Sequence, residues 1–232
     1  MDNKINREQK WIKATKKTFD LIAKRFSETR KKKDEVLDYF FSIFNPCGHT
    51  LEIGCGDARS LDYLEKKGFF AKPENFYLGI DYSRKLLSKA KKRRQNKIFN
   101  KKIEFALKDI LNLRFRNKFD SIFALAVIHH LPLSFQTIAL QNIFQALKKN
   151  GRFAGYVWAP KKPFIKKWRK IGKREYFKFW QNNKDWPIFY YLFKKTELKN
   201  LLINLGFKKI SIFKNKTNFP RIKENIFFIA QK

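Results

Sequence analysis

Cysteine, histidine and long apolar runs are scarce in this chain of 232 residues, and each shortage excludes a class of protein. The two cysteines, Cys47 and Cys55, cannot build a disulfide framework, and with three histidines we expect no metal centre. No apolar run approaches the roughly 18 residues that a membrane span needs. Residues 1–17 are polar and lack the apolar segment of a signal peptide. These absences predict a protein of the reducing cytoplasm with no membrane association.

Acidic residues are also scarce, since 20 Asp and Glu stand against 53 Lys and Arg, for a formal net charge of +33. A genome-wide bias toward lysine would give such an excess in every protein of the organism. The basic residues are concentrated, however, in residues 84–102 and 161–178, and the second block carries interleaved aromatic side chains. Charge mixed with stacking surface is typical of nucleic-acid binding. We therefore predict nucleic-acid contacts from Lys166, Lys167, Trp168, Arg169 and Lys170.

One stretch organises the rest of the chain, Thr50-Leu51-Glu52-Ile53-Gly54-Cys55-Gly56-Asp57-Ala58-Arg59. It predicts a short buried strand that runs into a Gly-x-Gly turn, with a helix behind it. Glycines permit a tight turn and a close ligand, and a helix N-terminus offers free N–H groups to an anion. A turn without a ligand is the plain alternative. The next strand ends in Asp81, 25 positions after Gly56 (81 − 56), where a ribose-binding acid belongs in a nucleotide-binding βαβ unit.

The residues within this motif discriminate between nucleotides. A dinucleotide site needs a third small residue below the pyrophosphate, and here that position is Arg59. Glu52 would also be unfavourable beside phosphates. The motif suits a ligand with a ribose, a cationic centre and no phosphate, a description that fits S-adenosylmethionine. Glu52-x-Gly54-x-Gly56 followed by Asp81 resembles the class I S-adenosylmethionine-dependent methyltransferases.

This resemblance implies that Asp109 accepts a hydrogen bond from the adenine amino group, although by itself Asp109 could equally be a turn residue. A near-continuous apolar strand over residues 119–128 ends in His129 and His130. A histidine pair there could be a base or a metal site. With one other histidine and no cysteine cluster, we expect it to line the cofactor pocket by packing and hydrogen bonding. The expected cofactor site is Glu52, Gly54, Cys55, Gly56, Asp81, Tyr82, Asp109, Ile110, Ala126 and His129.

Helical and strand patterns alternate along the chain. Residues 1–44 predict a helical extension that packs on the core, and residues 45–232 predict a methyltransferase core with a basic aromatic insertion at about 160–187. The resemblance implies an α/β, Rossmann-like class I fold, a doubly wound sheet of about seven strands, mostly parallel with a C-terminal antiparallel hairpin. After the first strand, further strands are expected at 76–81, 102–106, 119–128, 152–158, 208–213 and 225–230, with helices at 57–68, after Ser83, at 134–147 and at 195–205.

Further patches narrow the resemblance, namely Phe19-Asp20-x-Ile22-Ala23-x-x-Phe26-Ser27-x-Thr29-Arg30, Ala126-Val127-Ile128-His129-His130-Leu131 and Tyr156-Val157-Trp158-Ala159. With Tyr190-Tyr191 and Asn225 they resemble the tRNA wobble-uridine methyltransferases, which methylate the carboxymethyl group on uridine 34. This implies tRNA as the partner, substrate contacts from Arg30, Tyr190 and Tyr191, and, in nucleated cells, a small zinc-binding activator subunit. The chain departs from the family's pattern on the substrate side, at residues 31–33, Leu192 and Ile226.

The chemistry implied by this resemblance fits the residues present. A carboxylate acceptor is already ionised at pH 7, so its methylation requires no general base. Arg30 could orient either the substrate carboxylate or the cofactor's carboxylate by a bidentate contact, although its stretch could also be a solvated connection between helices. Two alternatives stay open: a methyltransferase of a small molecule or of another RNA site, and a basic RNA-binding protein without a cofactor. The intact Glu52, Gly54, Gly56, Asp81 and Asp109 argue against the last.

Overall fold

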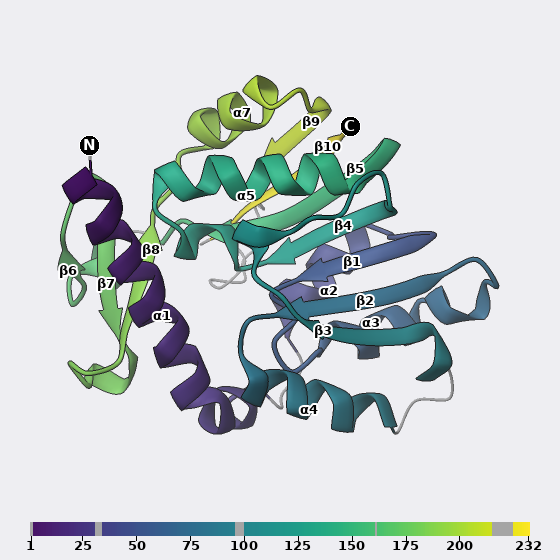
Figure 1. Ribbon diagram of the computed structural model, residues 1–232, viewed down its shortest axis with the longest axis horizontal. Coiled ribbons are helices and arrows are strands. Elements are labelled where there is room, and N and C mark those ends of the chain that lie inside the picture. The colour runs from purple at the N-terminus through teal and green to yellow at the C-terminus, as the bar shows by residue number, and fades with distance from the viewer. Residues whose placement is uncertain (1, 31–33, 96–99, 161, 215–224) are drawn as a thin grey trace.

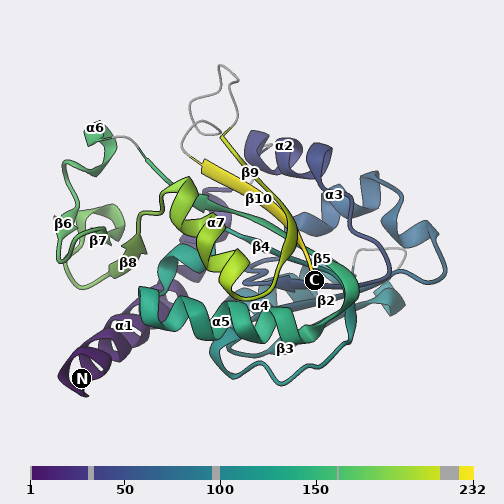
Figure 2. The ribbon, with the colours of Figure 1, turned by 90° about the horizontal axis from the view of Figure 1, so that it is seen from above.

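The computed structural model describes residues 2–30, 34–95, 100–160, 162–214 and 225–232. Seven strands form one sheet in the order β3-β2-β1-β4-β5-β10-β9 (Figure 1, Figure 2). The expected loop around Pro220 lies outside the described residues. The strands are β1 His49–Ile53, β2 Phe76–Asp81, β3 Ile103–Leu107, β4 Phe119–Leu125, β5 Leu147–Trp158, β9 Lys208–Phe213 and β10 Asn225–Gln231.

Strand directions confirm the predicted class I topology. β1 pairs in parallel with β2 and β4, and the parallel pairing continues outward to β3 and β5. β10 runs antiparallel to both β5 and β9, which makes the expected C-terminal hairpin. The order of strands reverses between β1 and β4. Open α/β sheets bind their ligands beyond the carboxyl ends of the strands at such a switch point, so the topology alone selects one edge of the sheet.

Helices cover both faces of the sheet, and each buries an apolar stripe there. α2, α3 and α4 pack on one face around Phe40 and Phe123, and α5 and α7 pack on the other around Leu140 and Phe153. Full burial of one such side chain stabilises a fold by about 1.5–3 kcal/mol. The helices are α2 Glu35–Ile43, α3 Ser60–Lys66, α4 Arg84–Gln95, α5 Leu133–Ala146 and α7 Lys195–Asn204, and the short 3-10 turns are η1 Phe69–Ala71, η2 Asn100–Lys102, η3 Ile110–Asn112, η4 Ile128–His130 and η5 Trp180–Asn182.

The first crossover helix is shorter than predicted. α3 begins at Ser60 and not at Asp57, because Gly54, Gly56 and Ala58 all adopt positive φ angles, of 66°, 58° and 57°. A backbone in the left-handed region cannot continue a right-handed helix. The loop between β1 and α3 is therefore an extended turn, and its N–H groups are available for contacts other than helix hydrogen bonds. The predicted cap of α4 is present, since Ser83 Oγ accepts from the Leu86 N–H at 3.2 Å.

The basic aromatic segment folds into a small sheet of its own. β6 (Arg169–Lys170), β7 (Glu175–Phe179) and β8 (Pro187–Tyr191) pair antiparallel, after the short helix α6 (Lys162–Ile165). The long helix α1 (Asp2–Glu28) lies beside β8 (Figure 1). Thr18 Oγ1 donates to the Pro187 carbonyl at 2.9 Å, and Thr15 Oγ1 accepts from the Phe189 N–H at 3.0 Å. These bonds hold the small sheet and the N-terminal helix together at one end of the main sheet.

No helix among the described residues is long and apolar enough to cross a membrane.

Candidate cofactor and substrate site

One large cavity lies at the carboxyl ends of the central strands, and its volume is about 1320 Å³. Its lining brings together residues that are far apart in the sequence, from the turn after β1, the end of β2, the segments after β3 and β4, α1 and the small sheet. All ten predicted cofactor residues line it, as do Arg30, Lys167, Trp168, Arg169 and Tyr190. Lys166, Lys170 and Tyr191 do not. Lys166 and Lys170 are exposed to solvent, and the Tyr191 hydroxyl donates to Glu197 at 2.5 Å.

The glycine turn is shaped by close contacts. Gly54 has a φ of 66°, and a Cβ at this position would lie 2.5 Å from Cγ2 of Val127, so a side chain is excluded twice over. The Gly56 N–H donates to Oδ2 of Asp81 at 2.9 Å, and the Cys55 N–H donates to the Ile80 carbonyl. The turn therefore uses these backbone N–H groups to bind the end of β2. At a helix N-terminus such N–H groups would be available to bind an anion.

Asp81 is held by this turn and by its own strand end. Its Oδ1 accepts from the Ser83 N–H at 2.8 Å while its Oδ2 accepts from Gly56. Burial raises the pKa of Asp81, and three backbone donors, from Ser83, Gly56 and Tyr82, oppose that rise. Each carboxylate oxygen has a second lone pair, so both can still accept from a ligand hydroxyl at the cavity wall.

Glu52 is a second buried acid, but its contacts lie within the protein. Ser60 Oγ and the Tyr77 hydroxyl both donate to Oε2 of Glu52. Burial raises the pKa of Glu52 to about 7, and the two hydroxyl donors lower it in part. Because both donors come from the elements that flank the turn, Glu52 ties β1 to α3 and β2 beneath the cavity.

Asp109 follows β3 and also has an unexpected partner. Its Oδ1 accepts from the Leu111 N–H at 3.1 Å and so caps η3, which is the turn role that the sequence left open. Its Oδ2 forms an ion pair with the ammonium of Lys16 on α1, which also lies 5.6 Å from the centre of the Tyr82 ring. Lys16 was not predicted, because nothing in its local sequence distinguishes it from the other lysines of α1.

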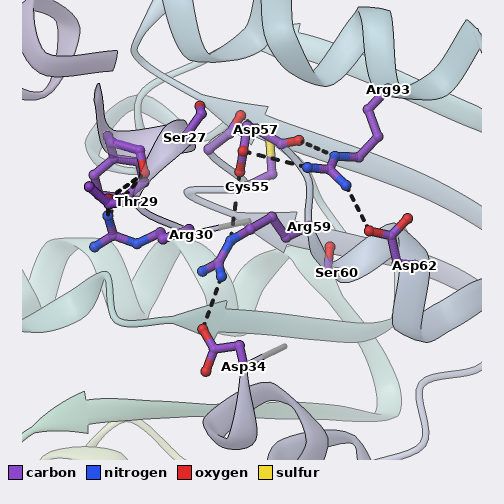
Figure 3. A network of polar contacts seen from close by, with 12 residues as sticks. Ser27, Thr29, Arg30, Asp34, Cys55, Asp57, Arg59, Ser60, Asp62 and Arg93 are labelled. Atoms are coloured by element: carbon purple, nitrogen blue, oxygen red, sulfur yellow. Dashed lines mark hydrogen bonds and ion pairs between the residues drawn. The ribbon is translucent and has the colours of Figure 1, made fainter. Parts of the chain in front are cut away.

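Arg30, drawn in Figure 3, lies just beyond the end of α1, and its side chain forms part of the cavity lining. Its Nη1 donates to the Phe26 carbonyl at 3.2 Å, and the guanidinium lies 3.5 Å from the Phe26 ring centre and 5.9 Å from that of Trp180. Among the described residues Arg30 forms no ion pair. Burial lowers the pKa of Arg30, and the nearby Arg59 lowers it further, although a guanidinium stays charged in proteins.

Arg59 differs from Arg30 in that acids surround it. Its Nη1 lies 3.0 Å from Oδ2 of Asp34, and its Nε lies 3.8 Å from Oδ1 of Asp57. Arg93 of α4 reaches the same Asp57 and also pairs with Asp62 at 2.7 Å (Figure 3). Arg59, the residue that does not fit the dinucleotide-binding pattern, is thus a structural cation. Its ion pairs join the turn after β1 to the start of α2. Asp34 also acts on Arg30 through its charge, but among the described residues Arg59 is the cavity arginine that forms ion pairs with this network and Arg30 is the one that does not.

Both histidines after β4 line the cavity in neutral form. His129 Nδ1 accepts from the Trp158 N–H at 3.2 Å, and His130 Nδ1 lies 2.9 Å from the Phe189 carbonyl, which can only accept. Burial lowers the pKa of His129 well below its usual value, and the neighbouring His130 lowers it further. His130 keeps part of its surface open, yet burial lowers its pKa to about 4, with Lys178 and Arg30 contributing. Neither imidazole is a charged group at neutral pH.

An aromatic wall formed by Trp158, Trp168 and Tyr190 completes the cavity. Trp168 lies 4.7 Å from Tyr190, and Trp158 lies 5.6 Å from Tyr190 with the rings 28° from parallel. The Lys178 ammonium lies 5.1 Å from the Trp158 ring centre and 5.6 Å from that of Trp168. Sequence reasoning identified Trp168 and Tyr190 but missed Lys178, whose place opposite the tryptophans depends on the pairing of β7 with β8. Within the described residues, no group of three or more His, Cys, Asp or Glu side chains could hold a metal ion.

Residues 44–197 match a family described as "Methyltransferase domain". A tRNA (carboxymethyluridine(34)-5-O)-methyltransferase of Xenopus tropicalis is 28% identical over 152 residues, which cover 65% of this chain and 22% of that protein. A protein of the same name from Schizosaccharomyces pombe is 29% identical over 144 residues, which cover 61% of this chain and 55% of that protein. The matched region therefore spans no more than 55% of the length of either relative.

Among solved structures, a DhpI-SAM-HEP complex superimposes with a TM-score of 0.71 at 13% identity, over 95% of this chain and 97% of that chain. This likeness concerns the fold, and it agrees with the strand order and the C-terminal hairpin described above. The family match covers most of the chain, and the acids at the ends of β2 and β3 stand on the same edge of the sheet as the turn after β1. The chain thus belongs to the methyltransferase domain family, and it has the class I methyltransferase fold.

Proposed function

We propose that this protein methylates the carboxylate of a 5-carboxymethyl group on the wobble uridine of tRNA and so forms the methyl ester. The single observation that carries the proposal is Arg30, a guanidinium in the cavity lining with no ion pair among the described residues. A half-buried cation that no protein carboxylate pairs with directly is suited to a carboxylate on the substrate. The curated relatives, which bear the name tRNA (carboxymethyluridine(34)-5-O)-methyltransferase, support this choice of substrate.

The neutral histidine pair supports the same reaction class. When bound, S-adenosylmethionine supplies a methyl group on a sulfonium, and a carboxylate oxygen takes that methyl group while the C–S bond breaks and a neutral thioether leaves. No proton has to be removed from an ionised carboxylate, and so no side chain has to act as a base. His129 and His130 are both held neutral by burial and carry fixed hydrogen bonds to the backbone. Their role is to shape the cavity and to exclude water from it.

The cofactor residues supply binding and orientation. Asp81 is placed to accept from ribose hydroxyls, since it lines the cavity and its oxygens are fixed by backbone donors. Asp109 is placed to accept from the adenine amino group, in which case that amino group takes up the oxygen that Lys16 contacts or shares it with Lys16. Arg30 then orients the acceptor carboxylate toward the methyl group. Positioning of this kind can supply much of the rate enhancement of a bimolecular transfer.

The charge of the chain is consistent with an RNA substrate. The net charge of +33 includes Lys167 and Arg169, which line the cavity, and Lys166 and Lys170, which are exposed beside them. Such cations neutralise phosphates with release of counterions, which supplies affinity without reading sequence. We propose that this segment binds the RNA backbone next to the opening of the cavity.

The deciding experiment is mass spectrometry of the nucleosides of tRNA that has been incubated with the purified protein and isotope-labelled S-adenosylmethionine. We expect the label in the methyl ester of 5-carboxymethyluridine at the wobble position. A tRNA whose wobble uridine lacks the carboxymethyl group is the matched control and should gain no label. Label in another nucleoside, or in a small molecule while tRNA stays unlabelled, would contradict the proposal and favour another acceptor for the same fold.

A further inference from the structure

The cavity is larger than one bound cofactor requires. A pocket for one drug-sized ligand usually measures about 300–1000 Å³, and this cavity measures about 1320 Å³. The residues assigned to the cofactor come from the segments after β1 to β4. The remaining lining comes from α1, the end of β5 and the small sheet, and it includes the aromatic wall of Trp158, Trp168 and Tyr190. The volume and the change of lining both indicate a second ligand site beside the first.

The geometry of the aromatic wall suits a planar ring. Trp158 and Trp168 lie 22° from parallel, with ring centres 6.3 Å apart, and Tyr190 packs against both. Tyr190 in turn stacks on His129, 13° from parallel at 5.3 Å. Tyr190 is tilted by 42° from Trp168 and by 28° from Trp158, so the two indoles share an orientation while Tyr190 packs beside them. The two half-buried indoles therefore offer flat aromatic surface to the cavity.

The wall also has polar character on the side of the cavity. Trp158 and Trp168 are half-buried, and the Lys178 ammonium lies within 6 Å of both ring centres, at 5.1 and 5.6 Å. A stacking face accepts every nucleobase, and the Lys178 ammonium, which lies over the two indole rings, is a donor for ring carbonyl oxygens, which a pyrimidine such as uracil carries. Trp186 belongs to the same aromatic cluster but does not line the cavity. The cluster therefore has a ligand-facing part and a packing part.

We propose that the aromatic wall is the binding site for the base of the target nucleotide, turned out of the RNA, and that Trp168 positions this base by stacking. The inference deepens the proposed function and rests on it for the class of substrate, a single-stranded RNA nucleotide with a pyrimidine base. Trp168 directly precedes β6 and stands between Lys167 and Arg169, which line the cavity with it. One short segment thus supplies a stacking ring and two cations for the flanking phosphates.

A thermodynamic cycle on binding tests this proposal without any methyl transfer. The probe is a fluorescently labelled anticodon stem-loop RNA with uridine at the wobble position, and its partner is the same RNA with an abasic site there. Fluorescence anisotropy gives the dissociation constant of each for the wild type and for Trp168→Ala. We expect Trp168→Ala to weaken the uridine RNA by about 5- to 150-fold, the range that base–aromatic stacking spans. The abasic RNA should lose little, because there is no base to stack, and the difference is the coupling between ring and base.

Two variants guard against a merely structural effect. Trp168→Phe keeps a smaller stacking ring and should restore most of the affinity for the uridine RNA. Trp186→Ala removes an indole from the packing part of the same cluster and should weaken both RNAs equally, if at all. Calorimetry with S-adenosylmethionine should give wild-type affinity for Trp168→Ala, which shows that the cofactor half is intact.

Moving the abasic site along the anticodon loop separates this inference from the proposed function. Coupling with Trp168 at the wobble position supports both. Coupling at a different position supports the base-binding wall and overturns the wobble assignment. If Trp168→Ala weakens RNA equally with and without each base, or has no effect, the wall does not bind the base, whatever nucleoside is methylated.

Discussion

The cofactor half of the cavity consists of carboxylates and backbone N–H groups, whereas the substrate half consists of aromatic rings and cations. Asp81 and Asp109 stand on the first side, and Arg30 and Lys178 stand on the second. The two ligands that we assign have the opposite charges, a sulfonium on one side and a carboxylate on the other. Transfer of the methyl group between them neutralises both. On the proposed assignment, the two halves would hold the two charged reactants apart from water and from each other's binding groups.

The substitution expected to have the largest effect on the cofactor half places a side chain in its glycine turn. Gly54→Val adds a β-branched side chain at a φ of 66°, with the Cβ 2.5 Å from Val127. We expect cofactor affinity to fall more than about 100-fold and the free energy of unfolding to fall by about 3 kcal/mol or more, since strain and clash add. Calorimetry with S-adenosylmethionine and urea unfolding measure the two effects. Gly68→Val is the control, because Gly68 has a φ of 70° but nothing within 4 Å of an added Cβ. An equal loss in both variants would contradict the role of the Val127 contact.

The corresponding test of the substrate half removes its cation. Arg30→Ala should lower kcat/KM for tRNA by about 100- to 1000-fold, the usual effect of losing one charge-stabilising group. Arg30→Lys should recover part of this, because an ammonium keeps the charge but not the bidentate geometry. Arg25→Ala, also near the end of α1 but bonded to Gln181 at 2.6 Å, is the matched control and should act like the wild type. Cofactor affinity should be unchanged in Arg30→Ala. A parallel loss of cofactor affinity would assign Arg30 to the carboxylate of the cofactor.

Glu52 offers a pH test of the cofactor half. Its pKa is about 7 in the folded protein and near 4.5 in an exposed carboxyl, so the folded state holds this proton more tightly. The stability that Glu52 contributes is therefore complete below about pH 4.5 and is lost as the pH rises through 7, by about 3 kcal/mol. Glu52→Gln keeps a group that accepts from Ser60 and Tyr77 but has no charge. We expect urea unfolding at pH 5 and pH 8 to show this decline in the wild type and in the exposed control Glu104→Gln, but not in Glu52→Gln. A decline of the same size in all three proteins would assign it to other groups.

Asp81→Ala should have a smaller effect that is confined to the cofactor. Lost ribose contacts and the unpaired Gly56 N–H should weaken S-adenosylmethionine by about 1–3 kcal/mol. Calorimetry measures this, and anisotropy with labelled RNA should show no change. If RNA affinity fell as much as cofactor affinity, the two halves would not be separable in the way that their chemistry suggests.

The cofactor half could be predicted from the sequence because its residues lie at the ends of consecutive strands. Once the alternation of strands and helices is recognised, Gly54, Asp81 and Asp109 must meet at one edge of the sheet. The C-terminal hairpin followed from the resemblance to the class I methyltransferases, and the structure confirms it. The late start of α3 did not, because Ala58 adopts a positive φ that no local preference of alanine indicates.

The substrate half depends on contacts between distant segments, which periodicity does not show. Thr18 reaches Pro187 across 169 positions, and Thr15 reaches Phe189 across 174. The sequence indicated that residues near 168 carry cations and aromatic rings, but not which of them face inward. Trp168 and Arg169 line the cavity while Lys170 does not, because the segment enters a two-residue strand whose pairing with β7 fixes its orientation.

The smallest expected effect concerns the histidines, which stand where the two halves meet. Burial lowers the pKa of His130 to about 4 and that of His129 well below its usual value, so both are neutral from pH 6 to 8. An acceptor carboxylate is ionised throughout the same window. In the Glu52→Gln background, which removes the carboxyl with a pKa of about 7, the single-turnover rate should therefore be flat between about pH 6 and 8. His130→Gln keeps a donor for the Phe189 carbonyl and should retain activity within roughly tenfold, or about 1.4 kcal/mol.

The opposite result would change the assignment of the acceptor. A rate that follows one ionisation near pH 6.5, together with an inactive His130→Gln, would mean that a neutral hydroxyl or amine gives up its proton to His130. Such an acceptor has no charge for Arg30 to bind, so Arg30→Ala should then cost little. The two histidine measurements and the Arg30 variant thus form one test, since a carboxylate acceptor requires the cation and not the base, and a neutral acceptor requires the reverse.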